Sequence, residues 1–210
     1  LHDALPILPN TVDILGVSAG FFILNFYVSP FGQNAVAALG SASRIEQVAL
    51  LPVLGVNTAI LALIAQNNGA GKIDRMYETL RTGLFYGVIL MLITMTLTII
   101  FARPLMRLFT ADPEIIEIGV QYARIRSIGL IPNAMFFAAA NVFRGLKRPY
   151  LPLAWNMLRF IFMPWLFIYI AIIQMGYGLT AIWIVSMVPF IIVGVASLDR
   201  KSTRLNSSHD

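Results

Sequence analysis

The sequence predicts an all-α, polytopic membrane protein with six transmembrane helices, and two observations carry that prediction. Of the 210 residues, 58% are hydrophobic and only 12% are charged, and the mean hydropathy is +0.78. Ordinary soluble domains carry roughly 25% charged residues, so a water-soluble core does not explain this composition. The apolar runs are about 20 residues long, which is the length of a membrane-spanning helix, and they lack the short alternating segments of a membrane barrel.

Six apolar segments have the length that a membrane span requires. The second is longer than a hydrocarbon core of about 30 Å needs, and we expect Pro52 to bend it. Thr110 or Asp112 is expected to cap the beginning of the fourth helix. The expected helices run over about residues 11–29, 35–67, 82–101, 115–143, 150–173 and 179–198.

The two ends of the chain differ in character from the rest. Residues 1–7 and 199–210 are typical of translated sequencing-adapter read-through, and we exclude both stretches from functional interpretation. The remaining residues, 8–198, are expected to form one membrane-embedded unit. Both histidines, His2 and His209, lie in the excluded ends.

The positive charge of the chain reflects its orientation in the membrane. A net charge of +5 would suggest nucleic-acid binding in a soluble protein, but here the basic residues lie in turns between apolar runs. Basic loops collect on the cytoplasmic side, so we expect both ends of the chain to face the cytoplasm and expect no nucleic-acid partner. The turns after the second and fourth helices hold Lys72, Arg75 and Arg81, and Arg144, Lys147 and Arg148.

No motif in the chain predicts catalysis or a metal site. Residues 16–20 read GVSAG and match the G-x-S-x-G pattern of serine hydrolases, but that pattern needs a preceding strand and a later histidine. The chain contains no cysteine, and no acidic pair stands at ligand spacing, so a metal has no visible ligands. We therefore expect a protein that is not an enzyme and holds no cofactor.

Charged residues inside apolar helices are costly, and they are functional candidates by default. Arg44 and Glu46 project about 200° apart on one helix, so each needs a partner on another element. Counting back from the cytoplasmic turns places them, with Arg124 and Arg126, near the outer boundary of the membrane. They either form an outer ion-pair layer that acts as a gate or reach toward the headgroups as surface charges; cation coupling at Glu46 is a further alternative.

Polar and aromatic residues on three helices are candidates for the lining of a substrate cavity. Ser18, Phe22 and Asn25 share one helix face because of their spacing, although small and polar residues also serve in helix packing. Asn57 lies on the same face of its helix as Glu46. The remaining candidates are Asn133 and Phe137.

Three stretches closely resemble the multidrug and toxic compound extrusion (MATE) transporters. They are AVAALGSASRIEQVALLPVLGVNTAILALIAQNNGAGKIDR at residues 35–75, FARPLMRLFTADPEIIEIGVQYARI at 101–125, and FRGLKRPYLPL at 143–153. The resemblance covers essentially residues 8–198 and is to the second six-helix lobe, nearer the DinF-like than the NorM-like branch. It implies one lobe of a twelve-helix, two-lobe antiporter in the bacterial inner membrane that exports cationic or amphipathic compounds in exchange for H⁺ or Na⁺.

The resemblance also bears on where the coupling ion binds. NorM-like members carry cation-site carboxylates on the first and fourth helices of this lobe, where the present chain offers Ser18, Asn25, Gln121 and Asn133 instead. This pattern is similar to DinF-like members, whose key aspartate lies in the first helix of the missing N-terminal lobe. The alternative function is a lipid-linked oligosaccharide flippase of the same superfamily.

Overall fold

The computed structural model describes residues 7–146, 150–171 and 177–206, and those residues are helical apart from short turns. The helix beginning at Ile7 and the one ending at Asn206 reach into the stretches 1–7 and 199–210, whose exclusion stays a prediction. The elements are α1 (Ile7–Val28), η1 (Ser29–Phe31), α2 (Gln33–Gly69), α3 (Ile73–Arg107), α4 (Pro113–Ile128), α5 (Leu130–Gly145), α6 (Tyr150–Met157), the π-helix η2 (Leu158–Phe162), α7 (Met163–Tyr169) and α8 (Leu179–Asn206).

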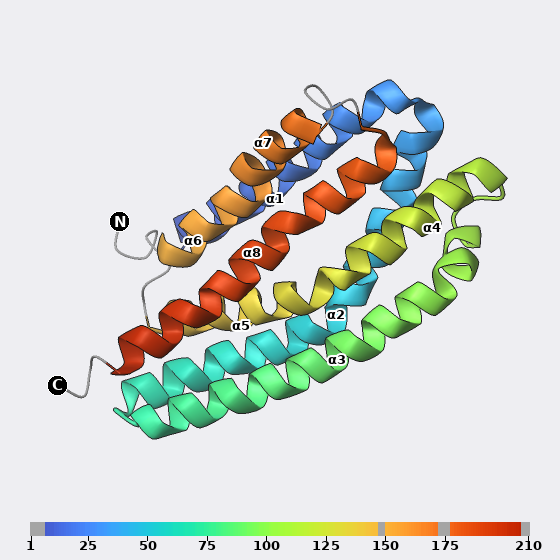
Figure 1. Cartoon of the computed structure of the whole chain (residues 1–210). Helices are drawn as coiled ribbons and strands as arrows, with labels where there is room; N and C mark the ends of the chain where they lie inside the picture. Colours follow the sequence, from blue (N-terminus) through green and yellow to red (C-terminus); the bar gives the residue numbers. More distant parts are fainter. Residues whose placement is uncertain (1–6, 147–149, 172–176, 207–210) are drawn as a thin grey trace.

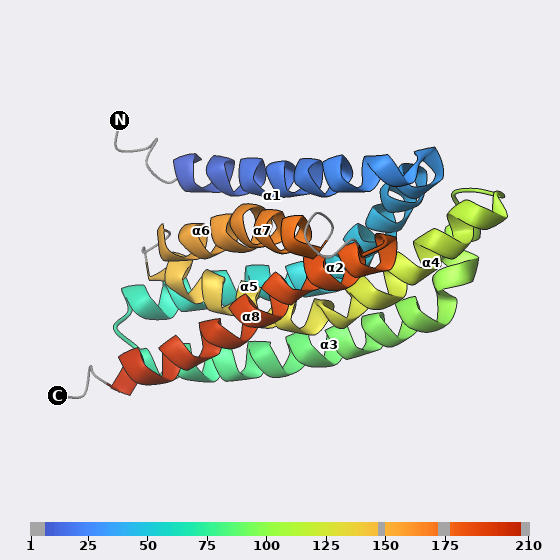
Figure 2. The ribbon, with the colours of Figure 1, turned by 45° about the horizontal axis from the view of Figure 1, so that its top comes forward.

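The helices run back and forth along one long axis (Figures 1 and 2). The α2–α3 turn and the start of α6 lie at the same end of the bundle as both chain ends, and the α1–α2 and α3–α4 connections lie at the other end. This alternation agrees with the expectation that the two basic turns share one side of the membrane.

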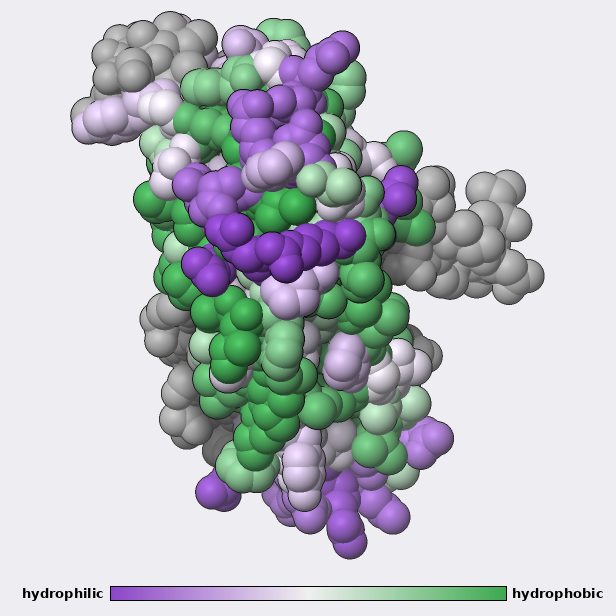
Figure 3. Space-filling view, turned by 90° about the vertical axis from the view of Figure 1, so that its right-hand side faces the viewer, coloured by the Kyte–Doolittle hydropathy of each residue, from purple (hydrophilic) through white to green (hydrophobic). Residues whose placement is uncertain are grey.

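The fold is that of a helical membrane protein, as the composition predicted. Among the residues that the structure describes, four single helical spans are long and apolar enough to cross a bilayer, and the bent pair α4–α5 makes a fifth if it counts as one span. The apolar part of α8, Leu179–Gly194, is shorter. In Figure 3 hydrophilic residues gather toward the top of the view and at its lower end, with a largely hydrophobic surface between them.

Several expected helix bounds were wrong. We expected a loop over 67–81, but α3 begins at Ile73, so that only residues 70–72 separate it from α2. The first turns of α3 are helical because Met76 and Leu80 pack onto a cluster that Ile60 and Ile64 of α2 share. This contact with α2 was not visible in the local sequence.

The helix expected over 115–143 is broken. It bends by 47° between α4 and α5, at Gly129. Pro132 follows three residues later and supplies no backbone N–H to continue the α4 ladder. The helix expected over 150–173 is also irregular, because η2 interrupts it with a π-helical turn.

The expected cap of the fourth helix is confirmed, whereas a bend caused by Pro52 stays a prediction. Pro52 lies inside the continuous helix α2, which changes direction along its length in Figure 1. Asp112 caps α4, and its side chain accepts hydrogen bonds from the backbone N–H groups of Glu114 and Ile115 at 2.8 and 3.3 Å.

The packing of α1 against η2 depends on glycine. A Cβ atom added at Gly20 would stand 2.5 Å from the carbonyl oxygen of Phe160, and one at Gly16 would meet the side chain of Met157 at 2.1 Å. Small residues on helices let backbones approach closely within membranes. The first helix therefore sits directly against the irregular turn.

Candidate functional site

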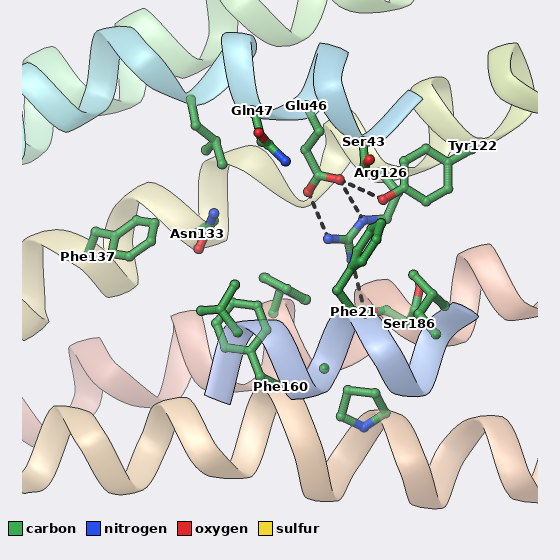
Figure 4. Close-up of a pocket in the computed structure, with 16 residues that line it drawn as sticks. Phe21, Ser43, Glu46, Gln47, Tyr122, Arg126, Asn133, Phe137, Phe160 and Ser186 are labelled. Carbon is green, nitrogen blue, oxygen red and sulfur yellow. Dashed lines mark hydrogen bonds and ion pairs between the residues drawn. The ribbon is translucent and has the colours of Figure 1, made fainter. Parts of the chain in front are cut away.

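A cavity of about 230 Å³ opens between the helices. Residues of α1, α2, α4, α5, η2, α7 and α8 contribute to its wall. Figure 4 shows side chains from several of these elements pointing into one space. The labelled lining residues are Phe21, Ser43, Glu46, Gln47, Tyr122, Arg126, Asn133, Phe137, Phe160 and Ser186.

An ion pair between Glu46 and Arg126 forms the polar part of the wall. A guanidinium nitrogen of Arg126 lies 2.8 Å from one carboxylate oxygen of Glu46, and its Nε donates to the other at 3.4 Å. The side chains are 19% and 11% exposed, so the pair is largely withdrawn from solvent.

Two further hydrogen bonds fix this pair. The hydroxyl of Tyr122, one helical turn before Arg126, donates to Glu46 at 2.7 Å. Arg126 also donates to the carbonyl oxygen of Ser186 on α8 at 3.2 Å. Buried charges are tolerated when they are paired and hydrogen-bonded, and these contacts tie α2, α4 and α8 together at one point (Figure 4).

Aromatic rings surround the pair. The guanidinium carbon of Arg126 lies 4.5 Å from the ring centre of Phe190, within the range of a cation–π contact. Tyr122 meets Trp183 edge to face at 5.0 Å between ring centres. The orientation of Tyr122 toward Glu46 is therefore set by packing as well as by its hydrogen bond.

A second arginine lies behind the cavity wall. Arg159 of η2 is fully buried and donates to the side-chain oxygen of Asn133 at 2.9 Å. Its guanidinium carbon lies 4.0 Å from the ring centre of Phe136, 4.7 Å from that of Phe160 and 4.9 Å from that of Phe190. The cavity is lined by three of these contacts of Arg159, namely Asn133, Phe160 and Phe190. Arg159 therefore supports the cavity wall from the side that faces away from the cavity.

Arg159 was missed by the sequence analysis. It stands inside the segment expected to span the membrane at 150–173, and a charge in a span is itself the signal of a functional candidate. Its aromatic surroundings could not be read from the sequence, because they come from α5 and α8 as well as from its own helix.

The predicted face of α1 does not line this cavity. Ser18 and Asn25 donate to the carbonyl oxygens of Ile14 and Phe21 in their own helix, and Phe22 is 73% exposed. The cavity is lined instead by the neighbouring face, with Val17, Gly20, Phe21 and Leu24. Whether Ser18, Phe22 and Asn25 line a larger cavity stays a prediction.

The other predicted residues divide in the same way. Asn133 and Phe137 line the cavity. Asn57 of α2 does not line it. Asn57 is buried, and its backbone carbonyl oxygen accepts a hydrogen bond from the side chain of Asn141 on α5 at 3.1 Å. Asn57 is therefore not part of the wall of this pocket, and whether it lines a larger cavity stays a prediction.

The four predicted gate charges do not all take part in one ion pair, and whether they form a layer stays a prediction. Glu46 pairs with Arg126, but Arg44 is exposed and Arg124 is exposed and donates to the carbonyl oxygen of Ile99 at 3.3 Å. The 200° between Arg44 and Glu46 explains this division, because only one of them can face the cavity.

Across the part of the chain that the structure describes, no group of three or more His, Cys, Asp or Glu could hold a metal ion.

Comparisons with known proteins place this arrangement in a family. Residues 9–170 match the MatE family. Over 129 residues the chain is 29% identical to an FAD transporter of Shewanella oneidensis, covering 61% of this chain and 28% of that protein. Over 140 residues it is 26% identical to a probable multidrug resistance protein NorM of Thermotoga maritima, covering 67% of this chain and 29% of that protein.

Solved structures share the fold. A transporter of the MOP superfamily from Pyrococcus furiosus aligns with a TM-score of 0.90 at 21% identity, over 97% of this chain and 46% of that one. A MATE crystal structure in complex with MaL6 aligns with a TM-score of 0.88 over 95% of this chain and 45% of that one. The chain thus spans less than half the length of these proteins, and it belongs to the MatE family, the multidrug and toxic compound extrusion transporters.

Proposed function

We propose that this chain is the second six-helix lobe of a two-lobe exporter that expels cationic or amphipathic drugs and metabolites in exchange for H⁺ or Na⁺. Relatives named as multidrug resistance or export proteins support the proposal, as does the coverage of less than half of the matching transporter structures. We place the protein in the bacterial inner membrane, with both chain ends in the cytoplasm.

The observation that carries the proposal is the cavity itself. Apolar and aromatic walls with a few placed polar groups are typical of small-molecule sites, which usually occupy about 300–1,000 Å³. At about 230 Å³ this cavity is smaller than a whole site. It fits part of a substrate pathway that the missing N-terminal lobe completes, with the exposed face of Ser18, Phe22 and Asn25 directed toward that lobe.

Glu46 and Arg126 are proposed to act as the gate of this lobe. Their pair and the contact to Ser186 join three helices beside the cavity, so separating them would let α8 move away from α2 and α4. Because Glu46 is already held by Arg126 and Tyr122, we place the coupling carboxylate in the other lobe.

Efflux from cells tests the proposal. The complete protein that carries this chain would be expressed in bacteria lacking their own drug pumps, with an empty-vector strain as control. Ethidium accumulation should fall, and it should rise again when the H⁺ gradient is collapsed or Na⁺ is removed. Accumulation that no ion gradient changes would contradict an antiporter.

A second candidate is a flippase or exporter of anionic compounds. The observation that favours it is Arg159, which places a second guanidinium group against three residues of the cavity wall. The relative named as an FAD transporter also points to anionic cargo. Rescue of a flippase-deficient strain, without any effect on ethidium, would favour this candidate.

A further inference from the structure

A second, smaller cavity lies near the C-terminal end of α2. It has a volume of about 170 Å³ and opens between the last turns of α2, the first turns of α3 and the end of α5. Its walls are aliphatic except for Asn68 and Tyr77. It shares no lining residue with the cavity that holds Glu46 and Arg126.

The floor of this cavity is part of the protein core. Ile64, Leu80 and Val142, which line it, belong to a buried cluster between the three helices. Gly145 lets α5 approach α2 here, since a Cβ atom at that position would stand 2.6 Å from the side chain of Ile64. The side chain of Asn68 donates to the carbonyl oxygen of Gly145 at 3.4 Å, so the helices that form the walls are held together.

The mouth of the cavity is exposed and apolar. Ile73, at the start of α3, is 55% exposed and Tyr77 is 36% exposed, and both line the cavity. A tyrosine beside an exposed aliphatic residue is typical of the membrane–water boundary, where aromatic side chains with polar tips are enriched. Such a mouth suits a position where lipid chains meet lipid headgroups.

Basic residues lie close in sequence to the residues that line this mouth. Lys72 directly precedes Ile73, and it is exposed. Residues 67–81 and Arg144, which the structure describes, together hold four basic and two acidic residues, whereas residues 102–117, around the α3–α4 connection at the other end of the bundle, hold two basic and three acidic. Arg75 is engaged with Glu78 at 3.3 Å, which leaves Lys72 as the basic residue next to the mouth in sequence.

We propose that this cavity binds an anionic phospholipid, with one acyl chain between α2, α3 and α5 and the phosphate beside Lys72. The aliphatic walls match a hydrocarbon chain, and the excess of basic residues matches a negatively charged headgroup. The site goes beyond the proposed transport function, because it lies outside the substrate cavity.

Native mass spectrometry of the complete protein tests the proposal. The protein would be incubated in detergent with equal amounts of phosphatidylglycerol and phosphatidylcholine, and the retained lipid counted after removal of excess. We expect phosphatidylglycerol to be retained preferentially. Lys72→Gln should lower its retention about fivefold, since one basic residue near an anionic surface contributes roughly that factor, and should leave phosphatidylcholine unchanged.

Two further variants locate the lipid. Ile73→Trp places a larger side chain at the mouth and should lower the retention of phosphatidylglycerol. Because Ile73 is exposed, the tryptophan can be accommodated without preventing the protein from folding. Arg103→Gln, at the other end of the bundle and paired with Glu117, is the matched control and should have no effect. Equal retention of both lipids, no change in Lys72→Gln, or no change in Ile73→Trp would each overturn the proposal. So would displacement of the lipid by ethidium, while loss of efflux would bear only on the transport proposal.

Discussion

Glu46 receives its hydrogen bonds from two side chains of α4, and the arginine among them also reaches a carbonyl group of α8. Removing one partner of a buried ion pair leaves the other charge without compensation, which costs more than the pair itself contributes. The interaction between the two side chains of the proposed gate can therefore be measured from protein stability, without a transport assay.

A double-mutant cycle should detect the coupling. Glu46→Gln and Arg126→Gln should each lower the free energy of unfolding by about 3 kcal/mol, and the double variant should lose less than the sum by about 1–3 kcal/mol. Chemical unfolding of the complete protein in micelles measures both values. The matched control is Arg75→Gln with Glu78→Gln, an exposed pair whose coupling should stay below about 1 kcal/mol; equal couplings would contradict a special role for Glu46.

Arg159 gives a second prediction at this scale. Arg159→Lys keeps the charge but loses the planar group that lies against Phe136 and Phe160, so stability should fall by about 2 kcal/mol. The ranking of exported compounds should also change, because Asn133 loses its present partner. Arg124→Lys, at an exposed position, is the control and should stay within about 0.5 kcal/mol of the parent.

At this scale the sequence told us which residues bear charge, not which residues meet. Glu46 and Arg126 could be chosen because charges in spans are costly, but their pairing joins positions 80 apart. Ser18, Phe22 and Asn25 were chosen by helical spacing, which defines a face and leaves open what that face contacts. The cavity lies beside the neighbouring face instead.

The helices themselves show where local signals suffice. Apolar length predicted the spans, and Asp112 was correctly expected as a possible cap. The break at Gly129 and the π-helix η2 were not expected, because each lies inside a run that is long and mostly apolar on both sides of the interruption. Such features depend on neighbouring helices, as the contact of Gly20 with the backbone of η2 illustrates.

Two glycine substitutions should behave oppositely. Gly20→Ala would bring a methyl group to 2.5 Å from a backbone carbonyl of Phe160, which cannot rotate away, so the thermal unfolding temperature of the complete protein should fall. Gly40→Ala has no atom within 4 Å of its new Cβ and should gain about 0.5–1 kcal/mol from helix propensity. A stable Gly20→Ala protein with unchanged packing of α1 would contradict the close contact described above.

The molecule as a whole carries opposite charge balances at its two ends, and this asymmetry predicts its orientation. The turn before α3 and the end of α5 lie together at the basic end, and the α3–α4 connection lies at the other. By the positive-inside rule we expect the basic end to lie in the cytoplasm.

Single-cysteine labelling can test that orientation, because the chain contains no cysteine. In a complete protein with no other cysteine, Ala111→Cys should react with an impermeant maleimide in intact cells. Asp74→Cys should react only after the membrane is opened. Both positions are exposed, so the two variants control for each other, and the reverse pattern would invert the proposed topology.

In the π-helix η2 the number of residues is not coupled to the rotation of the chain in the way that it is in an ordinary α-helix. In an α-helix each residue turns the chain by about 100°, so deleting one residue redirects every side chain beyond it. A wide π turn holds an extra residue, and its loss would restore an ordinary turn while α6 and α7 keep their faces. The segment Leu158–Phe162 is therefore a position where chain length could change over evolution with the surrounding helices still packed, and Arg159 is the side chain that such a change would move.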